Sequence, residues 1–354
     1  MIQDVYFVKT GDDPGMRKAP SAVEAIYDRA GVAHRIEPGE YVACKVHVGE
    51  VNNTTAVTPD VMAVLVARVK QKNALAFLTE TATLYRGERE NAVRHIMHAV
   101  DRGFTIERVG APFIMADGLA GDSEIEVAID GELNQSVFIA REARMADFLL
   151  VVSHMTGHIA TAFGCCLKNL GMGLASRRGK LRQHSSMSPS IIGEKCVRCG
   201  KCIDWCPQDA ITMETDSAFI HQDTCVGCGQ CLAVCRYGAV KFDWSRESSA
   251  IQKDVAEHAL GAVKDKKAFY INILINMTSD CDCFTTDQKK IIPDIGVVGS
   301  WDPVAVDQAS LDLTCQVAEK GIVGESYPDL NPEIQLDHGE KIGLGSRKYR
   351  LITL

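Results

Sequence analysis

The sequence predicts an α/β protein with a mostly parallel sheet flanked by helices and one short inserted module. Strand-length apolar runs alternate with segments of helical period over most of the 354 residues. The alternation stops at about residues 190–244, where eight cysteines gather, and resumes beyond them. The last 110 or so residues hold few strands for a sheet of their own. We therefore expect one α/β domain formed by residues 1–189 and 245–354, with 190–244 inserted. Three consecutive domains are the weaker alternative.

The expected strands are short apolar runs bounded by polar or glycine-containing loops. They cover residues 5–8, 41–46, 75–78 and 148–152 before the module, and 269–275 and 295–298 after it. Residues 124–129 and 136–139 predict a separate β excursion around Gly-Asp and Asp-Gly turns, and residues 348–354 predict an edge strand.

The expected helices show apolar spacing near 3.6 residues and plausible N-terminal signals. They cover residues 22–29, 58–70, 89–100, 251–263 and 303–319. Pro59 falls at a first helical position, and Asp302 followed by Pro303 is typical of an N-cap with proline behind it.

Composition excludes several classes of protein. Hydrophobic residues make up 46% and charged residues 24%, which is typical of a globular chain, and no apolar run approaches the roughly 20 residues of a membrane span. The net charge, 38 − 46 = −8, argues against nucleic-acid binding, which needs a basic surface. The N-terminus lacks a basic region followed by an apolar one, so we expect a cytoplasmic protein without membrane insertion.

The module carries a duplicated cysteine motif. Its first copy has the spacing CxxCxxCxxxC followed by Pro207, and the second repeats the spacing 29 residues later. This spacing is typical of bacterial two-cluster ferredoxins, in which the fourth cysteine of each motif ligates the other cluster. We expect two 4Fe-4S clusters, one held by Cys196, Cys199, Cys202 and Cys235, and the other by Cys225, Cys228, Cys231 and Cys206.

Zinc and disulfides are the alternatives for these cysteines. A tetrahedral zinc ion uses two cysteines per knuckle and leaves the third and fourth of each run unexplained. Disulfides are rare in the reducing cytoplasm expected for this chain. The module is therefore predicted to be an α+β ferredoxin-like unit for electron transfer.

Four polar loops follow predicted strands and would meet at one edge of a parallel sheet, where α/β proteins bind ligands. We expect a reactive cleft there, formed by His47, Asn53, Tyr85, Arg86, His154, His158, Lys168, Cys281 and Cys283. Lys168, His158 and His154 are the candidate proton donors or ligand contacts, and Arg86 is the candidate clamp for a carboxylate or phosphate. His154 and His158 would share a helical face if that turn is helical, and the Cys281/Cys283 pair is suited to a further soft metal ion.

The chain resembles the iron-sulfur family called domain of unknown function 362, in which an α/β domain carries a two-cluster ferredoxin segment. The resemblance spans nearly the whole length. It is carried by the cysteine motifs and by residues 45–50, 83–87, 164–173, 280–283, 293–296 and 300–307. The chain departs from the motif at Arg236, where the second copy would carry the proline that follows Cys206, and this should alter the turn beside one cluster.

The α/β part also resembles the N-terminal domain of the lactate racemase family. In that family a histidine, a lysine ten residues on and a histidine sixteen further surround a nickel-pincer nucleotide, and His158, Lys168 and His184 have these spacings. Cys165-Cys166 stands where that family has Gly-Gly, and the cysteine module is foreign to it. The resemblance implies a shared fold and not racemase activity.

Together these observations predict a redox protein whose clusters pass single electrons to or from a site in the α/β domain. Its partners would be a redox protein of unknown identity and a small-molecule ligand. An iron-sulfur oxidoreductase is the enzyme these residues would form, although the sequence names no substrate. The alternatives are a non-enzymatic electron carrier and a protein that handles metal ions or clusters.

Overall fold

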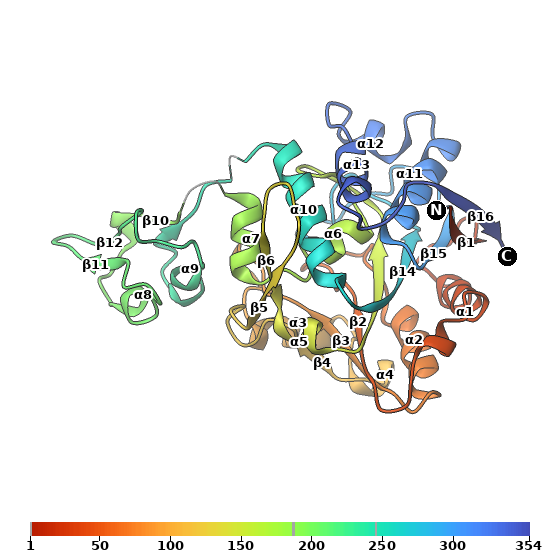
Figure 1. Ribbon diagram of the computed structural model, residues 1–354, viewed down its shortest axis with the longest axis horizontal. Helices are drawn as coiled ribbons and strands as arrows, with labels where there is room; N and C mark the ends of the chain where they lie inside the picture. Colours follow the sequence, from red (N-terminus) through yellow and green to blue (C-terminus); the bar gives the residue numbers. More distant parts are fainter. Residues whose placement is uncertain (1, 186–187, 245) are drawn as a thin grey trace.

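A computed structural model describes residues 2–185, 188–244 and 246–354. The excluded residues 186–187 and 245 adjoin the predicted domain boundaries, and the expectations that fall on them and on residue 1 lie outside the described residues. The chain forms a large α/β body and a smaller cysteine-rich lobe beside it (Figure 1). Within the described ranges no helix is both long and apolar enough to cross a membrane.

An eight-stranded sheet forms the centre of the α/β body. In spatial order its strands are β16 (Tyr349–Thr353), β1 (Gln3–Lys9), β15 (Gly296–Ser300), β14 (Lys267–Leu274), β7 (Phe148–His154), β2 (Tyr41–Lys45), β3 (Leu75–Glu80) and β4 (Phe113–Met115). Only β15 runs antiparallel to its neighbours, and the other adjacent pairs are parallel. The mostly parallel sheet is confirmed, as are the predicted strands and the edge position of residues 349–353.

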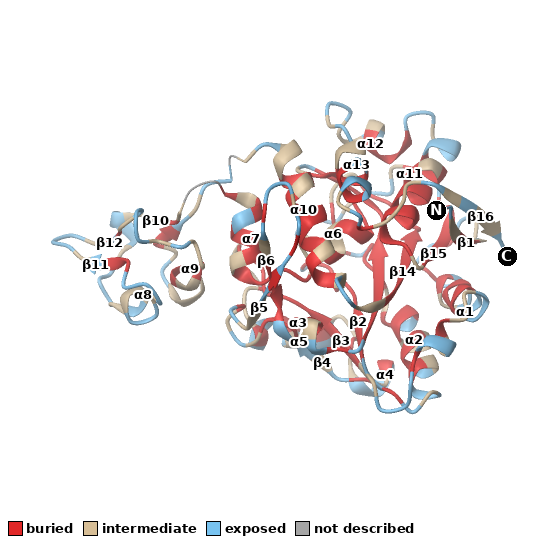
Figure 2. Cartoon of the chain, in the orientation of Figure 1, coloured by how far each residue is buried: buried red, intermediate tan, exposed pale blue. Residues whose placement is uncertain are grey.

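Helices cover both faces of the sheet. One face carries α1 (Ala19–Arg29), η1 (Val32–Arg35), α2 (Pro59–Lys70), α3 (Ala92–Asp101) and α4 (Ile106–Val109). The other carries α5 (Arg141–Met145), α6 (Cys166–Gly171), α10 (Ser248–Val263), α11 (Pro303–Val317), α12 (Gly321–Ser326) and α13 (Glu333–Lys341). The strands supply both cores by alternation: Phe148, Leu150 and Val152 of β7 pack on one side, and Leu149 and Val151 on the other. The buried sheet is visible in Figure 2.

The predicted helices are confirmed, with small shifts at their ends. Pro59 begins α2, and Asp302 caps α11 by accepting hydrogen bonds from the backbone N–H groups of Val304 and Ala305 at 2.9 and 2.8 Å. The predicted β excursion is the antiparallel hairpin of β5 (Glu124–Ala128) and β6 (Ser136–Ala140). Between β7 and α6 lies a second hairpin, β8 (Thr156–His158) with β9 (Ala162–Gly164).

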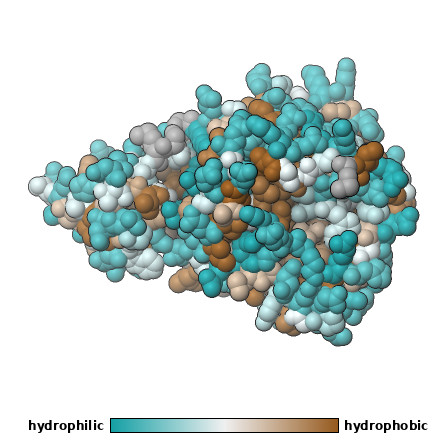
Figure 3. All heavy atoms as spheres, in the orientation of Figure 1, coloured by the Kyte–Doolittle hydropathy of each residue, from teal (hydrophilic) through white to brown (hydrophobic). Residues whose placement is uncertain are grey.

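In the sequence, the lobe lies between α7 (Arg177–His184) and α10. Its elements are β10 (Ser190–Ile191), η2 (Gly193–Lys195), α8 (Lys201–Asp204), β11 (Ile211–Met213), β12 (Ala218–Ile220), α9 (Gln230–Val234) and β13 (Val240–Lys241). Because β10 pairs with β13, the chain enters and leaves the lobe side by side. Its few apolar residues form a small core with several of the cysteines. The face shown in Figure 3 is predominantly hydrophilic.

Candidate functional site

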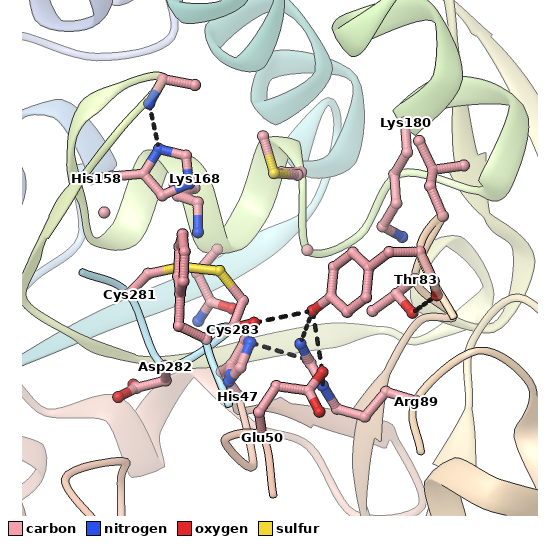
Figure 4. Close-up of a pocket in the computed structure, with 18 of the residues that line it drawn as sticks. His47, Glu50, Thr83, Arg89, His158, Lys168, Lys180, Cys281, Asp282 and Cys283 are labelled. Carbon is pink, nitrogen blue, oxygen red and sulfur yellow. Dashed lines mark hydrogen bonds and ion pairs between the residues drawn. A yellow bond between two sulfur atoms is a disulfide. The ribbon is translucent and has the colours of Figure 1, made fainter. Parts of the chain in front are cut away.

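A cavity of about 790 Å³ opens at the carboxyl ends of β14, β7, β2 and β3, the edge at which the sequence predicts a cleft. Eight of the nine expected residues line it, namely His47, Tyr85, Arg86, His154, His158, Lys168, Cys281 and Cys283. The ninth, Asn53, is buried beside the cavity, where its amide donates to Asp282 at 3.2 Å. Placing Asn53 in the wall was therefore wrong, because its side chain holds the loop that carries the two cysteines. Figure 4 shows how the labelled residues converge.

Buried charges occupy one wall of the cavity. The Glu80 carboxylate lies 3.6 Å from Lys45 Nζ and 3.4 Å from Arg89 Nη1, and its other oxygen lies 3.0 Å from His95 Nε2. Arg89 also donates to Glu50 at 2.7 Å. Burial lowers the pKa of Lys45 to about 8, although the neighbouring Glu80 opposes the shift. A buried carboxylate is stable only with such partners, so this cluster fixes the wall electrostatically.

His154 is held by acceptors at both ring nitrogens. Nδ1 lies 2.9 Å from the Asp282 carboxylate and Nε2 lies 2.8 Å from the carbonyl oxygen of Ile275. Although burial opposes it, the Asp282 charge raises the pKa of His154, and both nitrogens donate when the ring is protonated. Burial would raise the pKa of Asp282, but His154 outweighs it and lowers that pKa to about 2. His154 is thus a positioning cation with neither nitrogen free for a ligand.

His158 stands in β8, so the turn is not helical and the condition for a helical face shared with His154 is not met. Its Nδ1 accepts hydrogen bonds from the backbone N–H groups of Ala160 and Thr161 at 3.1 and 3.0 Å. Burial and the nearby Lys168 and His184 keep the pKa of His158 well below its usual range, so the ring is neutral. Because Nδ1 accepts, the proton of the neutral ring sits on Nε2.

Lys168 projects from α6 into the cavity. Among the residues that the structure describes, its amine has neither an ion pair nor a hydrogen-bond partner. Burial lowers the pKa of Lys168 to about 8, and Asp282 partly opposes this. His184, at the end of α7, lines the same cavity. A lysine with this pKa can either donate or accept a proton near neutral pH, which suits the role predicted for it.

Cys281 and Cys283 follow β14 and are joined by a disulfide, with 5.2 Å between their Cα atoms. One ring nitrogen of His158 and the two sulfurs lie within 4.8 Å of one another. Cys281 is buried and Cys283 half-buried. Two readings of this trio follow: a soft-metal site when the cysteines are reduced, or sulfur redox chemistry beside a histidine.

The lobe cysteines surround two small pockets, four around each. One is lined by Cys196, Cys199, Cys202 and Cys235, and the other by Cys206, Cys225, Cys228 and Cys231. The 29-residue repeat extends to backbone geometry, because the left-handed residues Arg198, Gly200 and Asp209 recur as Gly227, Gly229 and Gly238. It also extends to N–H···S contacts: the amide of Ala210 donates to Cys206 Sγ at 3.3 Å, and that of Ala239 to Cys235 Sγ at 3.4 Å.

The lobe and the cavity meet at Arg86. Its guanidinium donates to the carbonyl oxygen of Cys235 and, at 3.1 Å, to that of Arg236. Arg236 is the residue that replaces the expected proline, and its backbone carbonyl takes part in this contact with the body. The segments that connect the lobe to the body also line the cavity, through His184 on one side and Trp244 and Arg246 on the other.

Comparison with known proteins identifies the family. The sequence pattern described as "Domain of unknown function (DUF362)" matches residues 42–312. The chain belongs to this family. No curated protein matches it. Among solved structures, the lactate racemase apoprotein from Thermoanaerobacterium thermosaccharolyticum is similar at 12% identity, covering 90% of this chain and 58% of that one, with a TM-score of 0.44. A protein from Thermotoga maritima is similar at 10% identity, covering 88% and 60%, with a TM-score of 0.48. The chain thus spans about three fifths of the length of these structures.

Several site residues of this DUF362 member were not predicted from the sequence. Asp282 orients His154 and Asn53, yet in the sequence it reads as a spacer between two cysteines. Lys45 ends a buried strand. In the sequence, a charged residue within an apolar run was the signal that could have identified it. Lys180 and Arg89 also line the cavity. Their partners lie on other loops, so no local pattern reveals them.

Proposed function

We propose that this DUF362 protein is an iron-sulfur redox protein in which two 4Fe-4S clusters pass single electrons to or from the cavity. One observation carries the proposal: the eight lobe cysteines lie around two separate pockets in the two crossed sets of four. Each set takes three cysteines from one motif and the fourth from the other, which is the ligand pattern of a two-cluster ferredoxin.

The surroundings of Cys235 suit a thiolate ligand. Burial alone would raise the pKa of the Cys235 thiol, but the backbone N–H groups of Tyr237, Ala239, Val240 and Gly238 lower it overall. Amide donors to ligating sulfur are a usual means by which a protein tunes a cluster. When bound, the clusters would supply one-electron chemistry, and the residues of the chain would hold the ligand and its protons.

Within the cavity, Lys168 and the Nε2–H of His158 are the groups proposed to contact the small-molecule ligand. Arg86 has a different role from the anion clamp expected of it, because its guanidinium binds the Cys235 and Arg236 carbonyls. Its proposed role is to hold the lobe against the cavity. The location of both lobe connections in the cavity wall favours electron exchange between the two parts.

Paired cysteine variants test the crossed ligand sets. Crossed ligation predicts that Cys206→Ser with Cys225→Ser damages one cluster and leaves about four irons per chain, whereas Cys206→Ser with Cys196→Ser damages both. Ligation within each motif predicts the reverse, and that result would reject the proposal as stated. The matched control is Cys315→Ser, at an exposed cysteine outside the lobe, which should keep all the iron.

The carrier alternative needs no chemistry in the cavity. It predicts that Lys168→Met leaves every electron transfer of the protein unchanged. Our proposal predicts intact cluster spectra in this variant but impaired ligand binding or electron delivery, with Lys9→Met, at an exposed lysine, as the control.

A further inference from the structure

The Cys281–Cys283 bridge lies in the cavity wall, and it closes a loop of only three residues. Loop closure stabilises a fold more when the loop is long, so this bridge adds little as a structural staple. None of the other twelve cysteines is joined in a disulfide. This disulfide adds little to the stability of the fold, and it lies at the edge where the loops converge. A chemical role in the cavity explains it better than a structural one.

The geometry of His158 distinguishes sulfur chemistry from metal binding. A metal bound at Nε2 needs that nitrogen bare and the proton on Nδ1. Here Nδ1 faces the backbone N–H groups of Ala160 and Thr161, which can only donate, and the Thr161 hydroxyl at 2.9 Å, which can also donate. A proton on Nδ1 would point at the two backbone N–H groups, so the proton is left on Nε2. Nε2 has no hydrogen-bond partner within the described part of the chain. The ring is therefore set to donate a hydrogen bond into the cavity, toward the sulfurs that lie beside it.

The backbone of the cysteine pair is fixed from several sides. The backbone N–H of Glu50 donates to the Asp282 carbonyl at 2.9 Å, and the Asp282 carboxylate binds His154. The carbonyl oxygen of Cys281 accepts from the N–H of Phe284 at 3.1 Å. A rigid frame of this kind holds the two sulfurs in position whether or not they are bonded.

A continuous chain of contacts joins the pair to the lobe. The Tyr85 hydroxyl lies 3.4 Å from the carbonyl oxygen of Cys283, and Arg86, the next residue, donates to the carbonyl oxygen of Cys235. Cys235 of the lobe and Cys283 of the cavity thus contact the same two-residue segment, which follows β3.

We propose that Cys281–Cys283 is a redox-active disulfide and the electron acceptor of the cavity. Two electrons, delivered singly from an external one-electron donor by way of the lobe, break the S–S bond, and two protons complete two thiols. Through its Nε2–H, His158 stabilises the sulfur that leaves as a thiolate until solvent protonates it, and Lys168, beside His158 in Figure 4, delivers the other proton. The dithiol would then reduce a ligand that accepts two electrons. This inference rests on the proposed function, because the single electrons come from the clusters.

Thiol trapping tests the proposal on the full chain, purified without oxygen. The protein is reduced with methyl viologen radical or with dithiothreitol, alkylated, and digested for mass spectrometry of Cys281 and Cys283. We expect both residues to be blocked in the oxidised protein and alkylated after either reductant. In the Cys206→Ser/Cys196→Ser protein, dithiothreitol should still expose both thiols, while reduction by viologen should slow at least tenfold.

Two variants probe the route and the histidine. Arg86→Met should slow viologen reduction of the pair without changing the iron content or the response to dithiothreitol, whereas Arg94→Met, at an exposed arginine, should change none of these. His158→Ala removes the donor that favours the reduced form. The ratio of dithiol to disulfide in equilibrium with dithiothreitol should then fall about tenfold, equivalent to about 30 mV.

The outcomes separate the two proposals. Reduction by dithiothreitol but not by viologen in cluster-loaded protein overturns the assignment of the pair as acceptor and leaves the proposed function standing. Cysteines that remain reduced in the oxidised protein and bind a stoichiometric metal ion with His158 also overturn it. A preparation without iron instead overturns the proposed function. Reversible reduction by dithiothreitol would then still show whether the Cys281–Cys283 pair is redox-active.

Discussion

The buried charge cluster around Glu80 allows a quantitative test of the cavity wall. The substitution Glu80→Gln keeps the size of the side chain and removes its charge. Arg89 retains Glu50 at 2.7 Å, so the charge left without an opposite charge is that of Lys45, whose side chain is 0% exposed and whose Nζ still donates to Asn169 Oδ1 at 2.7 Å. Removing one partner of a buried ion pair costs about 3–5 kcal/mol. Lys45 can instead lose its proton: its pKa is about 8, so neutralising it in the folded protein at pH 7 costs about 1.4 kcal/mol, and this sets the ceiling.

We therefore expect Glu80→Gln to lower the free energy of unfolding by about 1.4 kcal/mol at pH 7, measured by urea denaturation with far-UV circular dichroism. The matched control is Glu88→Gln. Its ion pair with Arg94 is 3.6 Å long, both side chains are about half exposed, and its loss should cost less than about 0.5 kcal/mol. Because the pKa of Lys45 is about 8, the amine becomes neutral above that pH, and the effect of Glu80→Gln should shrink as pH rises through 8. A loss no greater than that of Glu88→Gln, or one independent of pH, would refute this prediction.

Two further predictions concern Lys168 and the packing of α6. Burial lowers the pKa of Lys168 to about 8, so its acylation, followed by mass spectrometry, should be half-maximal near pH 8 in the folded protein and near 10.4 in the unfolded chain. The folded state then holds fewer protons than the unfolded state between these values, and stability rises with pH. Lys168→Met should remove about 1 kcal/mol per pH unit of that rise, and an unchanged slope would contradict the burial argument. Gly171→Ala would place a Cβ 1.9 Å from the Val255 carbonyl oxygen, so α6 and α10 must separate, at a cost of at least about 2 kcal/mol. Gly193→Ala meets nothing closer than 3.6 Å and should be nearly neutral; equal effects would show that the helix contact is loose.

The sequence predicts the sheet well because its strands carry local signals. The run of β7 is apolar on both faces, as expected of a strand buried between two helical layers. The same topology places the cavity, since loops that follow neighbouring parallel strands must meet at one edge. The antiparallel direction of β15 and the β8–β9 hairpin were not predicted, because both depend on pairings between segments rather than on the segments themselves.

Side-chain roles within the cavity were harder to predict. His154 and His158 have the same residue type and lie four positions apart, yet one is a paired cation and the other a neutral donor. The difference comes from Asp282 in a distant loop and from two backbone amides in a hairpin. Residue type and spacing do not encode either environment. The position of the cleft was therefore predictable, whereas the role of each histidine within it was not.

The iron content of protein purified without oxygen tests the central claim most directly. The account predicts about eight irons per chain with a matching amount of acid-labile sulfide, and the visible absorption of 4Fe-4S clusters. Stoichiometric zinc with no visible absorption would contradict it.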